Sequence, residues 1–166
     1  LARHFKSTGN IVRFIEYMDV GNRNGWQLDE VMRASEIIRR INEEMPIEPL
    51  EVGYRGEVAT RYRYKDGEGE VGVISSVSAP FCGDCTRSRL STDGSIYTCL
   101  FAANGVSLRD PLRAGATDDE LKELISLIWG ARKDRYSEER TELSQQPKSS
   151  NQDTAPKKIE MYQIGG

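Results

Sequence analysis

All three cysteines of the chain lie in one stretch, FCGDCTRSRLSTDGSIYTCLF, and their spacing restricts how this stretch can fold. Cys82 and Cys85 form a C-x-x-C pair, a spacing at which a tight loop can turn two thiolates toward one metal. Cys99 follows after 13 residues, and the Asp-Gly pair at 93–94 between them is a strong hairpin signal. We therefore expect a hairpin that returns the chain, so that Cys99 can meet the first two thiols.

Three kinds of site are compatible with three thiols. The cysteines could be incidental buried or free residues, although a C-x-x-C pair closed by a hairpin is not a random pattern. A structural zinc ion requires a fourth ligand, which would be His4 or a carboxylate such as Asp84. A cubane iron–sulfur cluster uses four cysteines when it only transfers electrons. Three cysteines would leave one iron open to bind a small molecule.

Two arginines directly after the C-x-x-C pair favour the third kind of site. Arg87 and Arg89 are two positions apart, so in an extended segment their side chains project to the same side. Two guanidinium groups on one side can hold phosphate oxygens through paired hydrogen bonds. Arginines near thiolates can also balance negative charge or pair with carboxylates. Beside a metal with an open position, however, they indicate the binding of an anionic substrate.

Composition limits the setting of the protein. The net charge of −3 argues against a general nucleic-acid binder and against a protein that binds anionic membranes. No apolar run approaches the roughly 18 residues that a membrane-spanning helix needs. The first residues, LARHFKSTGN, lack the apolar core of a secretory signal. We therefore expect a cytoplasmic protein, in which clustered cysteines are metal ligands more often than disulfides.

The periodicity of the first third of the chain predicts one βα unit. A strand is expected within residues 10–22, with apolar residues on both alternating faces, as in a strand buried on both sides. A helix is expected over residues 34–44, where Ile37, Ile38 and Ile41 form an apolar stripe. Because the chain opens at a leucine and is soon in a strand, we expect it to be the downstream part of a longer protein.

The rest of the chain predicts small antiparallel elements. Residues 56–77 indicate two strands around the turn KDGEGE. Thr117 and Glu120 form a capping box that begins a helix. Residues 137–158 are polar and are expected to form a mobile linker, after which residues 159–166 resume a strand-like pattern. The expected fold class is therefore α/β (α+β).

These motifs resemble the C-terminal half of the GTP 3′,8-cyclases, which are radical S-adenosylmethionine (SAM) enzymes also called molybdenum cofactor biosynthesis protein A. The resemblance is carried by SAPFCGDCTRSRLSTDGSIYTCLF, by VRFIEYMDVGN upstream, and by LRAGATDDEL, KDRYSEER and the terminal Gly-Gly downstream. It covers the chain except for the linker near residues 144–157.

The resemblance implies a division of the chain into parts with different roles. Residues 1–48 would be the last βα unit or units of an incomplete TIM-like radical SAM barrel. Residues 49–136 would be the domain that binds cluster and substrate, with a small antiparallel sheet and a helix. Residues 137–158 would be the linker, and residues 159–166 a C-terminal strand and tail.

The resemblance also implies roles for individual residues. Cys82, Cys85 and Cys99 would hold the family's second [4Fe-4S] cluster, whose open iron binds the guanine base. The positions that contact GTP would be Arg87, Ser88 and Arg89. Met18 would contact SAM, and Arg13 is a candidate active-site residue, although strand alternation puts it on the face opposite Met18. Gly165 and Gly166 would form a tail that reaches into the active site.

The implied reaction converts GTP to (8S)-3′,8-cyclo-7,8-dihydroguanosine 5′-triphosphate, the first step toward molybdopterin. The implied parent enzyme is a homodimeric lyase that also needs SAM and a first [4Fe-4S] cluster. It is functionally linked to the cyclic pyranopterin monophosphate synthase. The chain has no C-x-x-x-C-x-x-C motif for the first cluster, so we predict that it is inactive alone. The alternative is a non-catalytic zinc-binding interaction module.

Overall fold

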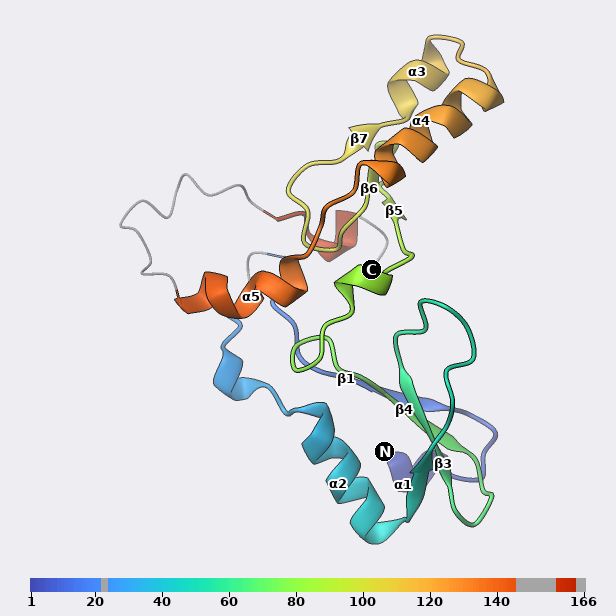
Figure 1. The fold of residues 1–166 in the computed structure, drawn as a ribbon, viewed down its shortest axis with the longest axis vertical. Coiled ribbons are helices and arrows are strands. Elements are labelled where there is room, and N and C mark those ends of the chain that lie inside the picture. The colour runs from blue at the N-terminus through green and yellow to red at the C-terminus, as the bar shows by residue number, and fades with distance from the viewer. Residues whose placement is uncertain (22–23, 146–157, 164–166) are drawn as a thin grey trace. The chain divides into compact units, whose positions relative to one another are not determined.

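The computed structural model describes residues 1–21, 24–145 and 158–163, with side chains of α5 described only as far as Arg140. The chain divides into two compact units, each of which is described separately (Figure 1). The first unit comprises Leu1–Met18 and Trp26–Cys85. The second comprises Asp19–Gly25 and the described residues from Thr86 onward. No helix in the described parts of the chain is both long and apolar enough to cross a membrane.

The first unit is built on a four-stranded mixed sheet with the order β1-β4-β3-β2. Strand β1 runs parallel to β4, and the other two pairings are antiparallel. The strands are β1 (Val12–Ile15), β2 (Ile47–Pro49), β3 (Thr60–Tyr64) and β4 (Glu70–Ile74). The helical elements are α1 (Ala2–Phe5), η1 (Leu28–Glu30), α2 (Ala34–Glu44) and η2 (Cys82–Asp84). The helix expected over residues 34–44 and the two strands expected within residues 56–77 are confirmed.

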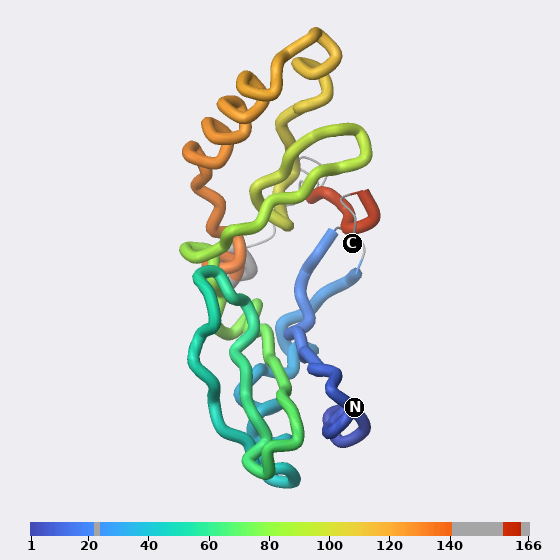
Figure 2. The backbone as a smooth tube through the Cα atoms, turned by 90° about the vertical axis from the view of Figure 1, so that its right-hand side faces the viewer, coloured from blue at the N-terminus to red at the C-terminus, as the bar shows by residue number. Residues whose placement is uncertain are grey.

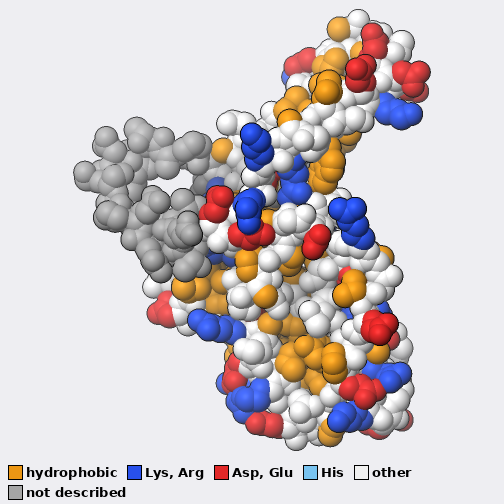
Figure 3. All heavy atoms as spheres, in the orientation of Figure 1, with side chains coloured by type: hydrophobic (Ala, Val, Ile, Leu, Met, Phe, Trp, Pro, Cys, Tyr) orange, Lys and Arg blue, Asp and Glu red, His pale blue; other side chains and the backbone are white. Residues whose placement is uncertain are grey.

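The core of the first unit lies between the helices and the sheet. Ile41 of α2 packs with Tyr64 and Val71, which are 2% and 0% exposed, and Ile37 and Ile38 pack against this cluster. The apolar stripe predicted for α2 is therefore the face that the helix buries. A hollow of about 640 Å³ opens between α2 and the sheet. Figure 3 shows hydrophobic side chains gathered in this region.

Strand β1 is shorter and more exposed than the sequence predicts. Its residues alternate between half-buried and exposed, and Phe14 packs into the core. Ile15 points to the opposite face and is 55% exposed. The prediction of a strand buried on both sides is therefore wrong for the described residues, because β1 is an edge strand with one face on the core.

The second unit contains a three-stranded antiparallel sheet with the order β5-β6-β7 and a set of helices. Its chain can be followed from green at β5 to orange at α4 in Figure 2. The hairpin expected at residues 93–94 is confirmed, and Gly94 has a φ of +82°, which suits glycine at this turn. The elements are β5 (Arg89–Leu90), β6 (Ser95–Tyr97), β7 (Val106–Ser107), α3 (Arg109–Arg113), α4 (Asp118–Gly130), α5 (Tyr136–Gln145) and η3 (Met161–Gln163).

Helix α4 begins at the predicted capping box. The Thr117 side chain accepts a hydrogen bond from the Glu120 N–H, and the Glu120 carboxylate accepts one from the Thr117 N–H. Two of the N–H groups that a helix start leaves without helical partners are thereby satisfied.

The end of the chain differs from the sequence prediction. Part of the expected linker, residues 137–145, is helical, because it belongs to α5. The rest of that linker, up to residue 157, lies outside the described residues. The expected C-terminal strand is instead the short helix η3, although the segment does dock within its unit, since the Ile159 N–H donates to the Ala102 carbonyl at 2.9 Å. The units also group the chain differently from the expected boundary at residues 48–49, because β1 pairs with β4.

Candidate functional site

The C-x-x-C pair lies on a tight turn at the end of the first unit. Cys82 opens the short helix η2, and the Cys85 N–H donates to the Cys82 carbonyl at 3.3 Å. Both thiols are half-buried, and neither forms a disulfide. Asp84, considered as a fourth zinc ligand, lies in the same turn and is exposed, whereas His4 lies in α1 with its ring edge against Phe5. The turn thus supplies two reduced thiols from one short segment.

The third thiol belongs to the second unit. Cys99 follows β6, is half-buried and forms no disulfide, and its sulfur accepts a hydrogen bond from the Phe101 N–H at 3.4 Å. Among the described residues, no group of three or more His, Cys, Asp and Glu side chains is arranged to hold a metal ion. Because the three thiols are divided between the units, the single three-thiolate site stays a prediction.

The arginines expected to clamp a phosphate lie at the start of the second unit. Arg87 and Ser88 are exposed and directly precede β5, and Arg89, the first residue of β5, is half-buried. Arg89 is paired with Tyr97 across the hairpin, so its backbone position is fixed by the same turn that leads to Cys99. The hairpin therefore links the position of this arginine to that of the third thiol.

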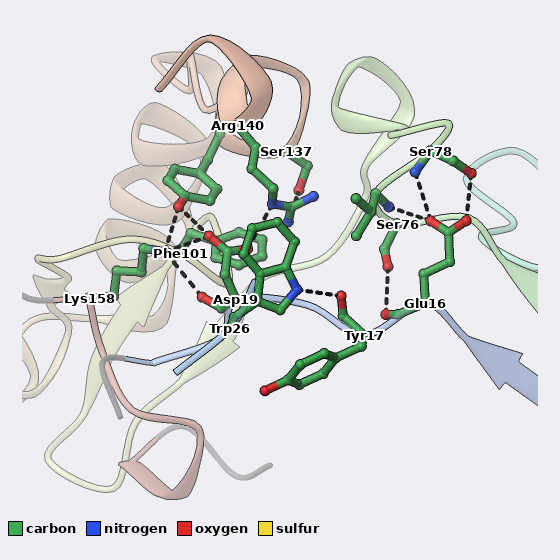
Figure 4. Close-up of polar contacts among 12 residues, drawn as sticks. Glu16, Tyr17, Asp19, Trp26, Ser76, Ser78, Phe101, Ser137, Arg140 and Lys158 are labelled. Carbon is green, nitrogen blue, oxygen red and sulfur yellow. Dashed lines mark hydrogen bonds and ion pairs between the residues drawn. The ribbon is translucent and has the colours of Figure 1, made fainter. Parts of the chain in front are cut away.

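A buried carboxylate that sequence reasoning missed organises the first unit. Glu16 directly follows β1 and is 2% exposed. Its carboxylate accepts hydrogen bonds from the backbone N–H groups of Ala34, Val77 and Ser78, each at 2.7 Å, and from the Ser78 hydroxyl at 2.5 Å (Figure 4). The Ser76 hydroxyl also donates to the Glu16 carbonyl at 3.2 Å. Three separate chain segments therefore meet at one side chain.

The bond to Ala34 is a helix cap supplied from a distance. Ala34 is the first residue of α2, and the N-cap residue Arg33 makes no side-chain capping bond. Glu16 satisfies one of the N–H groups at this helix start, where the helix dipole also favours a negative charge. The bonds to Val77 and Ser78 fix the loop that follows β4 and leads to Cys82. Glu16 therefore fixes the loop that precedes the turn at Cys82.

The surroundings of Glu16 keep it ionised. Burial alone would raise the pKa of its carboxyl group, but the hydrogen bonds from Ser78, Ala34 and Val77 outweigh burial and lower that pKa below its ordinary value. A buried charge is tolerated when donors surround it in this way. The available signal in the sequence was a lone acidic residue inside the apolar run VRFIEYM.

The other predicted site residues of this region lie on or after β1. Arg13 is an exposed residue of β1, opposite Gly72 of β4, and its Cγ lies 3.1 Å from where a Cβ on Gly72 would be. Met18 is half-buried and lies beyond the end of β1, so strand alternation does not decide which way it faces. Gly165 and Gly166 lie outside the described residues.

Comparison with known proteins gives the chain its relatives. The family model Molybdenum Cofactor Synthesis C matches residues 10–138. A protein named GTP 3′,8-cyclase from Acidothermus cellulolyticus is 48% identical over 182 residues, which cover 100% of this chain and 50% of the relative. A protein of the same name from Xanthomonas campestris is 45% identical, over 100% of this chain and 46% of its own length. Another from a Synechococcus species is 50% identical, over 85% of this chain and 41% of its own length. The chain spans about half the length of these relatives.

We predict that Glu16→Gln lowers the free energy of unfolding by about 2–3 kcal/mol at neutral pH, because an amide nitrogen would face N–H donors and charge-assisted bonds would be lost. The lowered pKa means that the carboxylate stabilises the fold above its ordinary pKa of 4.5, and that this contribution is lost as the pH falls through the lowered value. The difference between wild type and variant, measured by urea unfolding at several pH values, should therefore shrink in acid.

The matched control is Glu44→Gln, which removes an exposed carboxylate paired with Arg3 and should change stability little at any pH. Equal stability of Glu16→Gln and wild type at neutral pH would contradict the capping role.

Proposed function

Because the chain belongs to the Molybdenum Cofactor Synthesis C family, we propose that it supplies the GTP-binding part of a GTP 3′,8-cyclase. The observation that carries the proposal is a set of three thiols that form no disulfide, with Arg-Ser-Arg two residues after the second. It is supported by relatives named GTP 3′,8-cyclase that match along the chain. The proposed reaction converts GTP to (8S)-3′,8-cyclo-7,8-dihydroguanosine 5′-triphosphate in molybdenum cofactor biosynthesis.

Cys82, Cys85 and Cys99 would hold a [4Fe-4S] cluster. The donor set fits this group, since thiolates are the usual ligands of iron–sulfur clusters and none of the three thiols is in a disulfide. When bound, the cluster would provide one iron without a protein ligand, to which the guanine base binds. The role of the chain is to fix the thiols: the Glu16 carboxylate holds the loop before Cys82, and the β5–β6 hairpin precedes Cys99.

Arg87, Ser88 and Arg89 would bind the triphosphate of GTP. A guanidinium group presents a rigid fork of donors that matches phosphate oxygens, and a serine hydroxyl adds a further donor. The exposure of Arg87 and Ser88 makes their side chains accessible to a nucleotide. Holding base and phosphates at once fixes the ribose between them, and such positioning removes much of the entropic barrier of a reaction.

The radical-generating half of the reaction would come from elsewhere. We propose that the parent protein carries a first [4Fe-4S] cluster and SAM, with Met18 as a SAM contact, Arg13 as a candidate active-site residue and Gly165-Gly166 as an active-site tail. The three cysteines of this chain are used by the proposed cluster, and no C-x-x-x-C-x-x-C motif is present. The chain alone would therefore bind GTP without cyclising it.

We further propose that residues 1–48 contribute the last βα unit of an incomplete radical SAM barrel, followed by the cluster- and substrate-binding part. Strand β1 is followed by helix α2, and its position at the sheet edge supports pairing with a further strand. The exposed Ile15 side chain, on the outer face, supports a packing partner on that face. A homodimeric parent in the cytoplasm, whose product passes to the cyclic pyranopterin monophosphate synthase, is the setting that this family suggests.

We predict that the chain, purified and reconstituted without oxygen, is brown and binds iron and acid-labile sulfide in equal amounts. Substitution of any one of Cys82, Cys85 or Cys99 by serine should reduce iron uptake, because each removes a thiolate ligand. Iron and zinc analysis of the four proteins checks this. Colourless protein with stoichiometric zinc would contradict the proposal and support a zinc-binding module.

We predict that Arg87→Ala and Arg89→Ala each weaken GTP binding by about tenfold to a hundredfold, the effect of losing charge-assisted hydrogen bonds. Isothermal titration of the reconstituted chain with GTP measures this effect. Arg3→Ala is the control, because Arg3 is exposed and pairs with Glu44. If both variants bind GTP as tightly as wild type and the control, the phosphate clamp is wrong.

We predict that the reconstituted and reduced chain releases no 5′-deoxyadenosine from SAM, because the first cluster has no ligands in this chain. Chromatography of the reaction mixture measures the product. A mixture that also contains a full-length relative is the positive control. Formation of 5′-deoxyadenosine by the chain alone would contradict the predicted need for a separate radical generator.

A further inference from the structure

An ionic cluster in the second unit joins three segments that are far apart in the sequence. We call it the Asp19 cluster, and it consists of Asp19, Tyr136, Arg140 and Lys158. Asp19 comes directly after Met18. Tyr136 and Arg140 belong to α5, and Lys158 precedes η3. Figure 4 shows Arg140 and Lys158 converging on the Asp19 carboxylate. No role for any of these four residues was predicted from the sequence.

The contacts of the Asp19 cluster are specific. Arg140 Nε donates to Asp19 Oδ1 at 2.7 Å, and Lys158 Nζ donates to Asp19 Oδ2 at 2.8 Å and to the Asp19 carbonyl at 3.1 Å. The Tyr136 hydroxyl donates to the Asp19 carboxylate and accepts from Lys158. Arg140 is 3% exposed. Breaking one such contact leaves a buried charge with fewer partners, so the cluster constrains all three segments together.

An aromatic ring connects the Asp19 cluster to the cysteine hairpin. Phe101 is 8% exposed and stacks on Tyr136, with ring centroids 4.4 Å apart. The Arg140 guanidinium lies 5.1 Å from the Phe101 ring and the Lys158 ammonium 5.3 Å, both within cation–π range. The Phe101 N–H donates to the Cys99 sulfur. Phe101 therefore packs against the Asp19 cluster with its ring and hydrogen-bonds the Cys99 sulfur with its backbone.

The C-terminal segment hydrogen-bonds the turn that runs from Cys99 to Ala102. The Ile159 N–H donates to the Ala102 carbonyl at 2.9 Å, and Ile159 is 8% exposed. Lys158 therefore contacts the ring of Phe101, and Ile159 hydrogen-bonds the backbone of the next residue, Ala102. The turn from Cys99 to Ala102 is held by side chains from α5 and from the C-terminal segment.

We propose that the Asp19 cluster is a positioning group for the Cys99 thiol, acting through Phe101 and the docked residues Lys158 and Ile159. This inference rests on the proposed function, because Cys99 is a cluster ligand only there. It assigns Asp19, Tyr136, Arg140 and Lys158 a role in orienting the ligand that the second unit contributes. Hydrogen bonds to a ligating sulfur and the position of that sulfur are among the factors that set the potential of an iron–sulfur cluster.

The test compares Asp19→Asn and Lys158→Met with the rescue variant Lys158→Arg and the control Lys133→Met, which changes an exposed lysine. Hydrogen exchange of the metal-free full chain first measures the Ile159 amide. We expect exchange to rise at least about tenfold in Asp19→Asn and Lys158→Met, as when a local opening becomes easier. Wild-type protection is expected in the control, and partial or full protection in Lys158→Arg.

Electron paramagnetic resonance and the midpoint potential of the reconstituted cluster then test positioning. Both should change in Asp19→Asn and Lys158→Met and stay at wild-type values in the control. Unchanged Ile159 exchange, or faster exchange with an unchanged spectrum and potential, would overturn the inference. If wild type takes up no iron, both the proposed function and the positioning role fail. Faster Ile159 exchange in the variants would still show that the Asp19 cluster docks the C-terminal segment. Should Asp19→Asn fail to fold, Lys158→Met decides, since the Lys158 side chain is 22% exposed.

Discussion

The carboxylate of Glu16 is the contact on which the arrangement of the first unit depends. Four donors surround it, from the start of α2 and from the loop after β4, so its charge is compensated although it is 2% exposed. The cost of burying a charge is large when partners are missing and small when donors are already in place. Strand, helix and cysteine loop are therefore tied to one side chain, and the turn at Cys82 begins from a fixed point.

A second carboxylate, which is half-buried, follows three residues later and organises the other unit. Asp19 binds two cations and a tyrosine hydroxyl, and this group packs on Phe101, next to the turn that carries Cys99. The two acidic residues thus flank Met18 in the sequence, with one anchored in each unit. Glu16 binds the loop that leads to Cys82 and Cys85, whereas Asp19 is linked to the turn at Cys99 through its partner Arg140 and Phe101. In the proposed function, the chain's own contribution to catalysis is this positioning of ligands, guanine and phosphates.

Local sequence signals predicted the elements well, whereas tertiary contacts escaped prediction. Helix α2 and its Ile41 stripe, the hairpin at Gly94 and the capping box at Thr117 follow from periodicity, turn chemistry and spacing, all of which are local. The polar stretch from residue 137 was expected to be irregular, but α5 is stabilised in part by Arg140, whose partner Asp19 is 121 positions away. No local pattern reveals such a pairing. The roles of Glu16 and Asp19 were missed for the same reason.

In the proposed function, three thiolates would leave one iron of the cluster open to bind the guanine base. The most direct measurement is pulsed electron paramagnetic resonance on the reduced, anaerobically reconstituted chain, with GTP labelled with nitrogen-15 in the guanine ring. We predict a nitrogen-15 hyperfine coupling of the size expected for a direct iron–nitrogen bond, which is replaced by the corresponding nitrogen-14 coupling when unlabelled GTP is used. A chain that binds GTP and a cluster but shows no such coupling to the guanine ring would contradict the claim.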